Sequence, residues 1–254
     1  MHNATINPTA VTTTSNSAGI GELGLRDLLL HGLTVSSGAV DAISFLALGK
    51  VFSAFMTGNI AFLGLRVARA PGPGVVSILV SMAAFAVGVY LSARIVPYES
   101  CGIWSHRVTI ALGVSLIAHA TFLEVWFATK GQPPIDVAHI LLGLWGLAMG
   151  MQSAAVRRLR VDGVFTTAAT ATVIFLVGDL VNWRATVEER RRLTGVLVSL
   201  FVGATAGGLL LVHAQIYAPV LPFAITVVVV AIAAIALREH SRAEQLGGRT
   251  GVSA

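Results

Sequence analysis

The chain has 254 residues, of which 55% are apolar and only 11% charged, and its mean hydropathy is +0.81. A soluble domain carries about 25% charged residues, so this chain could not cover a globular surface with polar groups. Lipid must be its solvent over much of its length. The net charge of +5 does not indicate nucleic-acid binding, because the basic residues lie in short runs between apolar segments, which is typical of membrane topology signals.

The two ends of the chain differ from its middle. Residues 1–21 are rich in Thr, Ser and Asn and are expected to form a disordered tail. A transmembrane domain is expected over residues 22–237, and a cytoplasmic C-terminal tail over residues 238–254. Cys101 is the lone cysteine, so the chain has neither an internal disulfide nor a cysteine-rich metal site.

Six apolar segments are long enough to cross roughly 30 Å of hydrocarbon as helices. In chain order they are Leu28–Gly49, Val75–Ala93, Val108–Thr129, Val137–Val156, Thr194–Val212 and Tyr217–Leu237. Two further segments, Val51–Leu65 and Gly163–Gly178, are shorter than the ~17–25 residues of an ordinary span and are rich in small and polar residues. We expect them to be re-entrant, broken or buried helices. The predicted fold class is therefore all-α, a polytopic transmembrane helical bundle.

The placement of basic residues bears on the number of crossings, since Lys and Arg gather in cytoplasmic loops. With six crossings, most arginines share one side with both termini, and the other side keeps Lys50, Arg66, Arg69 and Lys130. With eight crossings the division is less unequal, although both termini are still cytoplasmic. Six crossings fit better, and eight stay open as the alternative.

The two halves of the chain are related in sequence, as repeat 1 (about 28–129) and repeat 2 (about 137–237). The shared elements are Gly38–Ala42 with Gly150–Ala154, Val51-Phe52 with Val164-Phe165, and Thr57–Asn59 with Thr170–Thr172. Six crossings would make the halves three-helix units of opposite orientation. Inverted repeats with short, interrupted helices in matching places are a recurrent transporter design.

Several of these motifs resemble the signatures of a known family. The first-half motifs are Gly38-Ala-Val-Asp41-Ala-Ile-Ser-Phe45, Gly49-Lys-Val-Phe52 and Met56-Thr-Gly-Asn59, and the second-half motifs are Gly150-Met-Gln-Ser-Ala-Ala-Val-Arg-Arg158 and Thr166-Thr167 with Thr170. They resemble the YoaK-like family, an uncharacterised bacterial membrane protein family also called DUF1275 or UPF0700. The resemblance covers about Leu28 to Leu237 and implies a multi-pass protein of the bacterial plasma (inner) membrane, without an activity. Ser153 and Ala171 depart from the family pattern, which has Asn and Gly there.

Asp41 is the strongest candidate for function, because a carboxylate inside a membrane costs several kcal/mol unless it is paired, hydrated or protonated. Thr34, Ser37, Asp41 and Ser44 recur at helical spacing and form one polar stripe on an apolar helix. The stripe should face the protein interior or a cavity. We predict that Asp41 binds a proton, a cation or a polar substrate group. The alternative is that Asp41 caps the neighbouring broken helix or bonds across a helix interface.

Thr57, Gly58 and Asn59 are expected to interrupt the first short segment, with Gly58 as the helix break and the two polar side chains coordinating a substrate opposite Asp41. Thr167 and Thr170 would be the second-half counterparts, and Gln152 could join the site. A purely structural role stays open for each of these residues, because Asn and Thr can satisfy backbone groups that a broken helix leaves unpaired.

Other features have simpler interpretations. His119 and Glu124 are five residues apart, which does not place them on one helix face, and Glu124 is expected to be solvated. Gly143, Gly146 and Gly150 form a small-residue stripe, as do the residues from Gly203 to Gly207, and both predict close helix packing.

The sequence contains no HExxH pair, phosphate-binding loop, nucleophile elbow or Rossmann fingerprint. We therefore expect a protein that is not an enzyme and has no cofactor or metal site. The hypothesis is a small-solute transporter or permease of the plasma membrane, with proton coupling through Asp41 left open. Its expected partners are the lipid bilayer and an unidentified small solute but no nucleic acid, and a homo-oligomer is left open. The alternative is a non-transporting membrane scaffold or accessory subunit.

Overall fold

A computed structural model of the protein describes residues 20–97, 104–159, 173–174, 177–178 and 186–250. The second short segment, Gly163–Gly178, lies largely outside the described residues, and with it the predicted site residues Thr167 and Thr170. The first helix begins at Ile20, two residues before the predicted start of the transmembrane domain.

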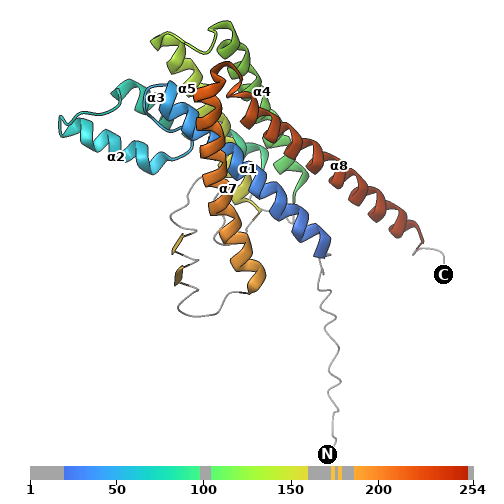
Figure 1. The fold of residues 1–254 in the computed structure, drawn as a ribbon. Coiled ribbons are helices and arrows are strands. Elements are labelled where there is room, and N and C mark those ends of the chain that lie inside the picture. Colours follow the sequence, from blue (N-terminus) through green and yellow to red (C-terminus); the bar gives the residue numbers. More distant parts are fainter. Residues whose placement is uncertain (1–19, 98–103, 160–172, 175–176, 179–185, 251–254) are drawn as a thin grey trace, which may run out of the picture.

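Six described helices are long and apolar enough to cross a membrane (Figure 1). They are α1 (Ile20–Ala47), α3 (Val75–Ile95), α4 (His106–Ala128), α5 (Ile135–Arg157), α7 (Val187–His213) and α8 (Val220–Thr250). These helices confirm the six predicted spans. The helix α2 (Met56–Val67) and the 3₁₀ turn η1 (Gln215–Tyr217) complete the described elements.

Local chemistry fixes several helix ends. Ser105 and Thr186 lie just before α4 and α7, and their side-chain oxygens accept hydrogen bonds from the backbone N–H groups of Arg107 and Glu189. Hydroxyl side chains at this position satisfy N–H groups that have no partner inside the helix. The turn between α4 and α5 contains Gly131 at a φ of 75°, a conformation that favours glycine.

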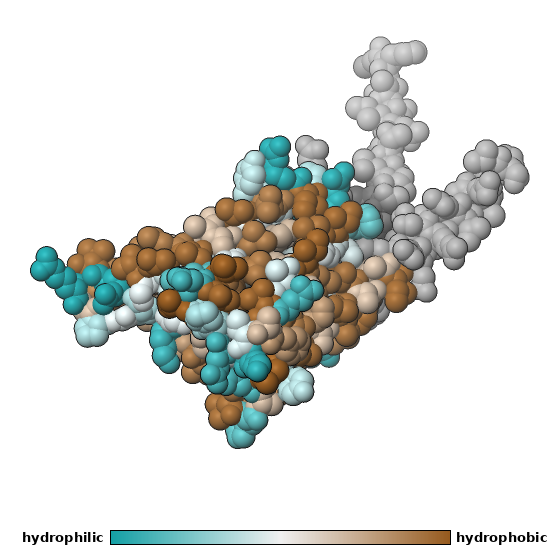
Figure 2. Space-filling view, turned by 90° about the horizontal axis from the view of Figure 1, so that it is seen from above, coloured by the Kyte–Doolittle hydropathy of each residue, from teal (hydrophilic) through white to brown (hydrophobic). Residues whose placement is uncertain are grey.

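The exterior of the bundle is apolar. Figure 2 shows hydrophobic residues over much of the visible face. The spans expose large apolar side chains such as Ile117, Ile140 and Phe201, which are 66%, 59% and 71% exposed. A soluble monomer rarely presents such continuous apolar surface, whereas lipid tails solvate it without cost. The chain is therefore a multi-pass membrane protein in contact with the bilayer.

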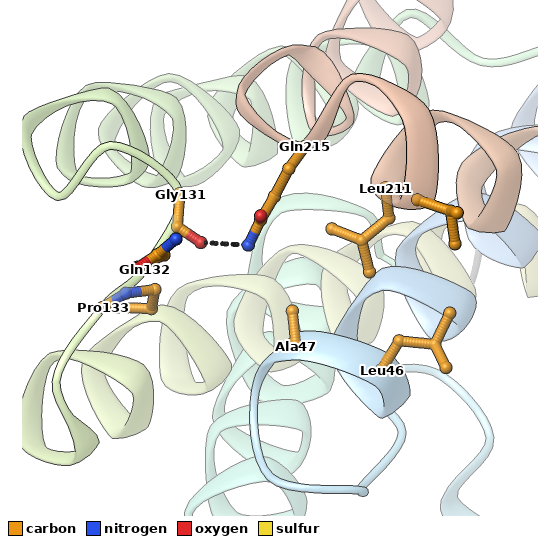
Figure 3. A pocket seen from close by; sticks show the side chains of 8 residues that line it. Leu46, Ala47, Gly131, Gln132, Pro133, Leu211 and Gln215 are labelled. Carbon is orange, nitrogen blue, oxygen red and sulfur yellow. Dashed lines mark hydrogen bonds between the residues drawn. The ribbon is translucent and has the colours of Figure 1, made fainter.

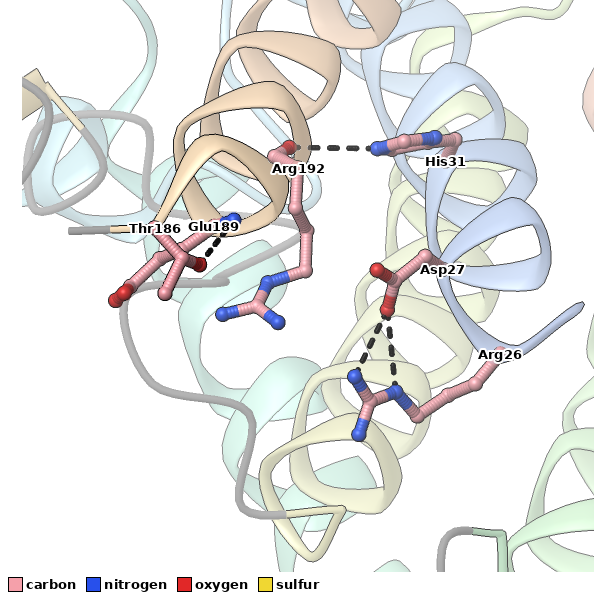
Figure 4. Close-up of polar contacts among 6 residues, drawn as sticks. All are labelled: Arg26, Asp27, His31, Thr186, Glu189 and Arg192. Carbon is pink, nitrogen blue, oxygen red and sulfur yellow. Dashed lines mark hydrogen bonds and ion pairs between the residues drawn. The ribbon is translucent and has the colours of Figure 1, made fainter. Parts of the chain in front are cut away.

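The directions of the helices show how often the described chain crosses. Leu46 and Ala47 of α1, Gly131 after α4, and Leu211 of α7 line one cavity (Figure 3), so α1, α4 and α7 all end on one side of the bundle. We call this side the Gly131 end. At the opposite side, His31 near the start of α1 lies 3.3 Å from the carbonyl oxygen of Arg192 near the start of α7 (Figure 4). We call it the Arg192 end.

The remaining spans run in the opposite direction. The α4–α5 turn starts α5 at the Gly131 end, and Ser77 near the start of α3 bonds His139 near the start of α5 at 3.1 Å. The six spans thus alternate, α2 does not cross, and α5 ends on the side where α7 begins. Eight crossings would put the ends of α1 and α4 on opposite sides, so that alternative is wrong for the described spans.

The spans pack in two close pairs, α1 with α7 and α3 with α5. A Cβ atom on Gly38 would overlap the carbonyl of Leu200, and one on Gly203 would overlap the carbonyl of Val35. In the other pair, Gly150 faces the carbonyl of Phe85 in the same way. Small residues let helix backbones approach closely in a membrane, so the predicted packing role of both glycine stripes is confirmed.

The buried apolar residues form two clusters along the bundle. The Gly131-end cluster includes Val40, Ile43, Phe122, Trp126, Trp145 and Met149. The Arg192-end cluster includes Leu30, Leu33, Leu112, Val156, Val196 and Val229. Between the two clusters, α1, α4 and α5 carry buried polar side chains, among them Ser37, Ser115 and Gln152.

Candidate functional site

After α1 the chain folds back toward the bundle. Gly49 and Lys50 adopt positive φ angles of 111° and 65°, and residues 48–55, the re-entrant loop, return alongside the last turns of α1. The backbone N–H groups of Ser53 and Ala54 donate to Oδ1 of Asp41 at 2.9 and 2.7 Å. Asp41 precedes the end of α1 by six residues, which is about 9 Å of helix. The loop therefore reaches back about that far along α1.

The geometry of Asp41 matches the structural alternative left open for it. Backbone N–H groups at membrane depth need a partner within the protein or in cavity water. A carboxylate is a strong acceptor for two such groups at once. Asp41 therefore caps the re-entrant loop, and its side chain is only partly buried.

Asn59 holds the same loop from the other side. Its Oδ1 accepts from the N–H of Phe52 at 3.0 Å, and its Nδ2 donates to the carbonyl oxygen of Phe52 at 2.7 Å. Ser81 of α3 donates to that oxygen at 2.6 Å, and the hydroxyls of Ser44 and Ser53 lie 2.8 Å apart. An amide offers both a donor and an acceptor, so Asn59 pairs with the backbone as a neighbouring strand would.

Two predictions for this region are wrong. Gly58 is not a helix break, because α2 runs through it and the break lies before Met56. A Cβ atom there would come within 2.7 Å of the Phe55 ring, so Gly58 leaves room for that ring. The structure also does not bring Thr57 into a site with Asp41. Its side chain is exposed and has no hydrogen bond to the described residues, whereas Asn59 is fully buried.

A second group of polar side chains lies between the two apolar clusters, and we call it the polar layer. Its members are each at most 2% exposed: Thr34, Ser36, Ser37, Ser115, His119, Gln152 and Thr226. They come from α1, α4, α5 and α8. Two of them, Ser37 and Gln152, were predicted site residues, and the structure places both in this layer rather than beside Asn59.

Some groups of the polar layer are hydrogen-bonded within the protein. Gln152 donates through Nε2 to the carbonyl oxygen of Leu33 at 3.1 Å and so links α5 to α1. The hydroxyl of Ser36 lies 3.1 Å from both the carbonyl oxygen of Pro222 and Oγ1 of Thr226, and so links α1 to α8. Thr34 and Ser115 bond to carbonyl groups of their own helices.

Four other atoms of the polar layer are buried without a hydrogen-bond partner among the described residues. They are Oγ of Ser37, Oε1 of Gln152 and both ring nitrogens of His119. A buried polar atom left unpaired costs about 1–3 kcal/mol. These four atoms are therefore candidates for hydrogen bonds to a bound molecule.

The packing of α4 against α5 relates the positions of His119 and Gln152. The rings of Phe122 and Trp145 stack with centroids 3.6 Å apart, which sets the register of these antiparallel helices. His119 lies one turn before Phe122, and Gln152 lies two turns after Trp145. Long helical side chains lean toward the N-terminus of their own helix, so we expect these two to lean toward the same level of the bundle.

The sequence analysis missed His119, although a signal was present. Val108, Leu112, Ser115, His119, Phe122 and Trp126 recur at helical spacing, and all six are buried. Glu124, five residues after His119, does not belong to this stripe. Glu124 is exposed, which agrees with its predicted solvated role.

Comparisons with known proteins agree with this architecture. The family model described as "Protein of unknown function (DUF1275)" matches residues 29–233. The chain is 33% identical over 155 residues to "UPF0700 transmembrane protein YoaK" of Bacillus subtilis (strain 168), which covers 61% of this chain and 67% of that protein. No solved structure matches the chain. The matched region contains both the re-entrant loop and the polar layer, and the chain belongs to the DUF1275 family.

Proposed function

We propose that the protein is a plasma-membrane transporter or permease that binds a small polar solute in the polar layer. The observation that carries this proposal is the set of four unpaired polar atoms, buried between two apolar clusters and contributed by α1, α4 and α5. Unpaired polar groups inside a membrane protein generally mark substrate or ion pathways. In this proposal Asp41, one helical turn after Ser37 on α1, positions the re-entrant loop and does not bind the solute.

Matching glycine contacts in the two halves of the chain support the proposal. Gly38 and Gly150 are 112 positions apart, and each faces a carbonyl on its partner helix, that of Leu200 or Phe85. Those two carbonyl residues are in turn 115 positions apart. Gly38 on α1 thus corresponds to Gly150 on α5, and Leu200 on α7 corresponds to Phe85 on α3. The contact between α1 and α7 is therefore equivalent to the contact between α5 and α3.

The same relation recurs one turn away. The carbonyl of Val35 faces Gly203, and the carbonyl of Leu147 faces Gly88, again with separations of 112 and 115. Because α1 and α5 run in opposite directions, the repeat would be inverted. Transporters of this kind bind substrate near the bilayer midplane where the repeats meet, and Gln152 meets α1 within the polar layer.

We also propose that the Arg192 end is cytoplasmic, together with both termini, because most arginines lie on that side. A reporter active only outside the cytoplasm should be active when fused after Arg69 and inactive when fused after Arg158. An enzyme active only in the cytoplasm should give the reverse pattern. Activity on the same side for both fusions, or the opposite assignment, would contradict this topology.

A thermal-shift screen tests the proposed function. Purified protein is heated with a panel of amides, polyols, sugars, amino acids and amines. A solute present at about 100 times its Kd stabilises the native state by about 2.7 kcal/mol, which for a chain of this size raises the Tm by roughly 5–10 °C. The replacement His119→Leu should abolish that shift without lowering the Tm of the solute-free protein, since its ring bonds no described residue.

Ser92→Ala is the matched control, because its hydroxyl is also buried without a partner among the described residues but lies near the end of α3, outside the polar layer. It should keep the response, and uptake of the stabilising solute into proteoliposomes should then follow the same pattern. If solutes gave no shift that depends on His119 while a partner protein co-purified in equal amounts, the scaffold alternative would be favoured instead.

A further inference from the structure

A cavity opens at the Gly131 end, between the ends of α1 and α7 on one side and the α4–α5 turn on the other. Its volume is about 460 Å³, and Figure 3 shows the side chains that line it. One wall consists of Leu46, Ala47, Leu211, Val212 and Gln215, and the other of Gly131, Gln132 and Pro133. The lining is apolar apart from two glutamine amides and the backbone, and it includes no ionisable side chain.

Two hydrogen bonds connect the residues of the two walls. Gln215 donates through Nε2 to the carbonyl oxygen of Gly131 at 2.8 Å (Figure 3). The indole N–H of Trp126 donates to the backbone carbonyl oxygen of Gln215 at 3.2 Å. The first of these bonds, which we call the latch, joins the α4–α5 turn to the α7–α8 turn through a single side chain.

Three buried aromatic rings continue from the latch toward the polar layer. Trp126 stacks on Phe122 at 5.9 Å, and Phe122 stacks on Trp145 at 3.6 Å. His119 lies one helical turn before Phe122 on α4, on the side away from the latch. The cavity, the latch, the aromatic rings and His119 therefore follow one another along α4 and its contact with α5.

We propose that this cavity is the access site through which an uncharged solute reaches the polar layer, and that Gln215 holds the path closed. The inference rests on the proposed function for what happens in the layer. The neutral lining favours solutes without a net charge, because an ion that left water there would find no opposite charge. Opening requires the latch to break and the rings to move apart.

Thiol labelling tests the inference on the intact protein. The lone cysteine is removed as Cys101→Ser, and Ser37→Cys then reports access to the polar layer. Neutral iodoacetamide and anionic iodoacetate form a matched pair of reagents, each rate being normalised to its rate with glutathione. Adding Gln215→Ala should raise labelling by iodoacetamide about fivefold, the population shift that corresponds to one neutral hydrogen bond.

Gln132→Ala is the matched control, because it also removes a glutamine amide from the cavity lining but leaves the bond between Gln215 and Gly131 intact. It should leave the rate unchanged. Iodoacetate should label at least tenfold more slowly than iodoacetamide in each protein. Should Gln215→Ala fail to fold, Gln215→Asn keeps an amide that is too short to reach Gly131, and the same increase is expected.

The outcomes separate the two proposals. Equal rates in the wild-type, Gln132→Ala and Gln215→Ala backgrounds would overturn the role of Gln215, and equal labelling by both reagents would overturn the assignment of an uncharged solute. Ile117→Cys, on α4 and 66% exposed to lipid, controls for reagent arriving through the bilayer. If Ser37→Cys were never labelled faster than Ile117→Cys, the polar layer would be inaccessible, and the proposed function itself would fail.

Discussion

Replacement of Gly150 by alanine is expected to destabilise the protein by about 2–3 kcal/mol, the usual cost of inserting a methyl group into a tightly packed interior. The new Cβ atom would overlap the carbonyl of Phe85 on α3. Backbone atoms cannot rotate aside as a flexible side chain can, so α3 and α5 would have to separate. Thermal unfolding in detergent, followed by the loss of monodisperse protein on size exclusion, measures the effect.

The same experiment carries its own controls. Gly113→Ala lies on α4 with nothing among the described residues within 4 Å of the added atom, so it should be neutral or stabilising by up to ~1 kcal/mol through helix propensity. If the repeat relation holds, Gly88→Ala and Gly203→Ala should be destabilising by similar amounts, because each meets a backbone carbonyl in the equivalent contact. A Gly150→Ala protein as stable as the wild type would contradict the close packing of α3 and α5.

The spans and their glycine stripes could be predicted because each depends on a local pattern. A segment such as Val75–Ala93 is continuously apolar, and lipid solvates any helix of sufficient length. The glycines at 143, 146 and 150 share one helix face whatever the neighbour is. Neither pattern identifies the neighbour, so the pairing of α1 with α7 and of α3 with α5, across the two halves, needed coordinates.

The site could be predicted only in part, because its polar groups divide between two places. Asp41, Ser44 and Asn59 were expected to surround a solute. Instead, Asp41 and Asn59 bond backbone groups of the re-entrant loop, and Ser44 bonds the hydroxyl of Ser53 in the same loop. The sequence shows which side chains can form hydrogen bonds. It does not show whether the partner is a backbone group of the same chain or a bound solute. His119 and Gln152 come from different helices, and their common burial in the polar layer depends on how those helices pack.

Asp41→Ala is expected to produce the largest loss of stability among single side-chain changes at the loop. It removes the acceptor for the N–H groups of Ser53 and Ala54. Each buried donor left unpaired costs about 1–3 kcal/mol, so the two together should lower the free energy of unfolding by about 2–6 kcal/mol. Yield of folded protein and the Tm in detergent measure this directly.

Asp41→Asn separates the capping role from a solute-binding role. An asparagine keeps Oδ1 as an acceptor in the same position, so it should retain most of the stability, with a loss of about 1 kcal/mol for exchanging a charged acceptor for a neutral one. If the carboxylate itself bound a proton or a cation, both substitutions would leave the fold intact and abolish the response to solute together. A stable Asp41→Asn protein that still responds to solute, beside an unstable Asp41→Ala protein, would assign Asp41 to the loop. Binding would then belong to the unpaired groups of Ser37, His119 and Gln152.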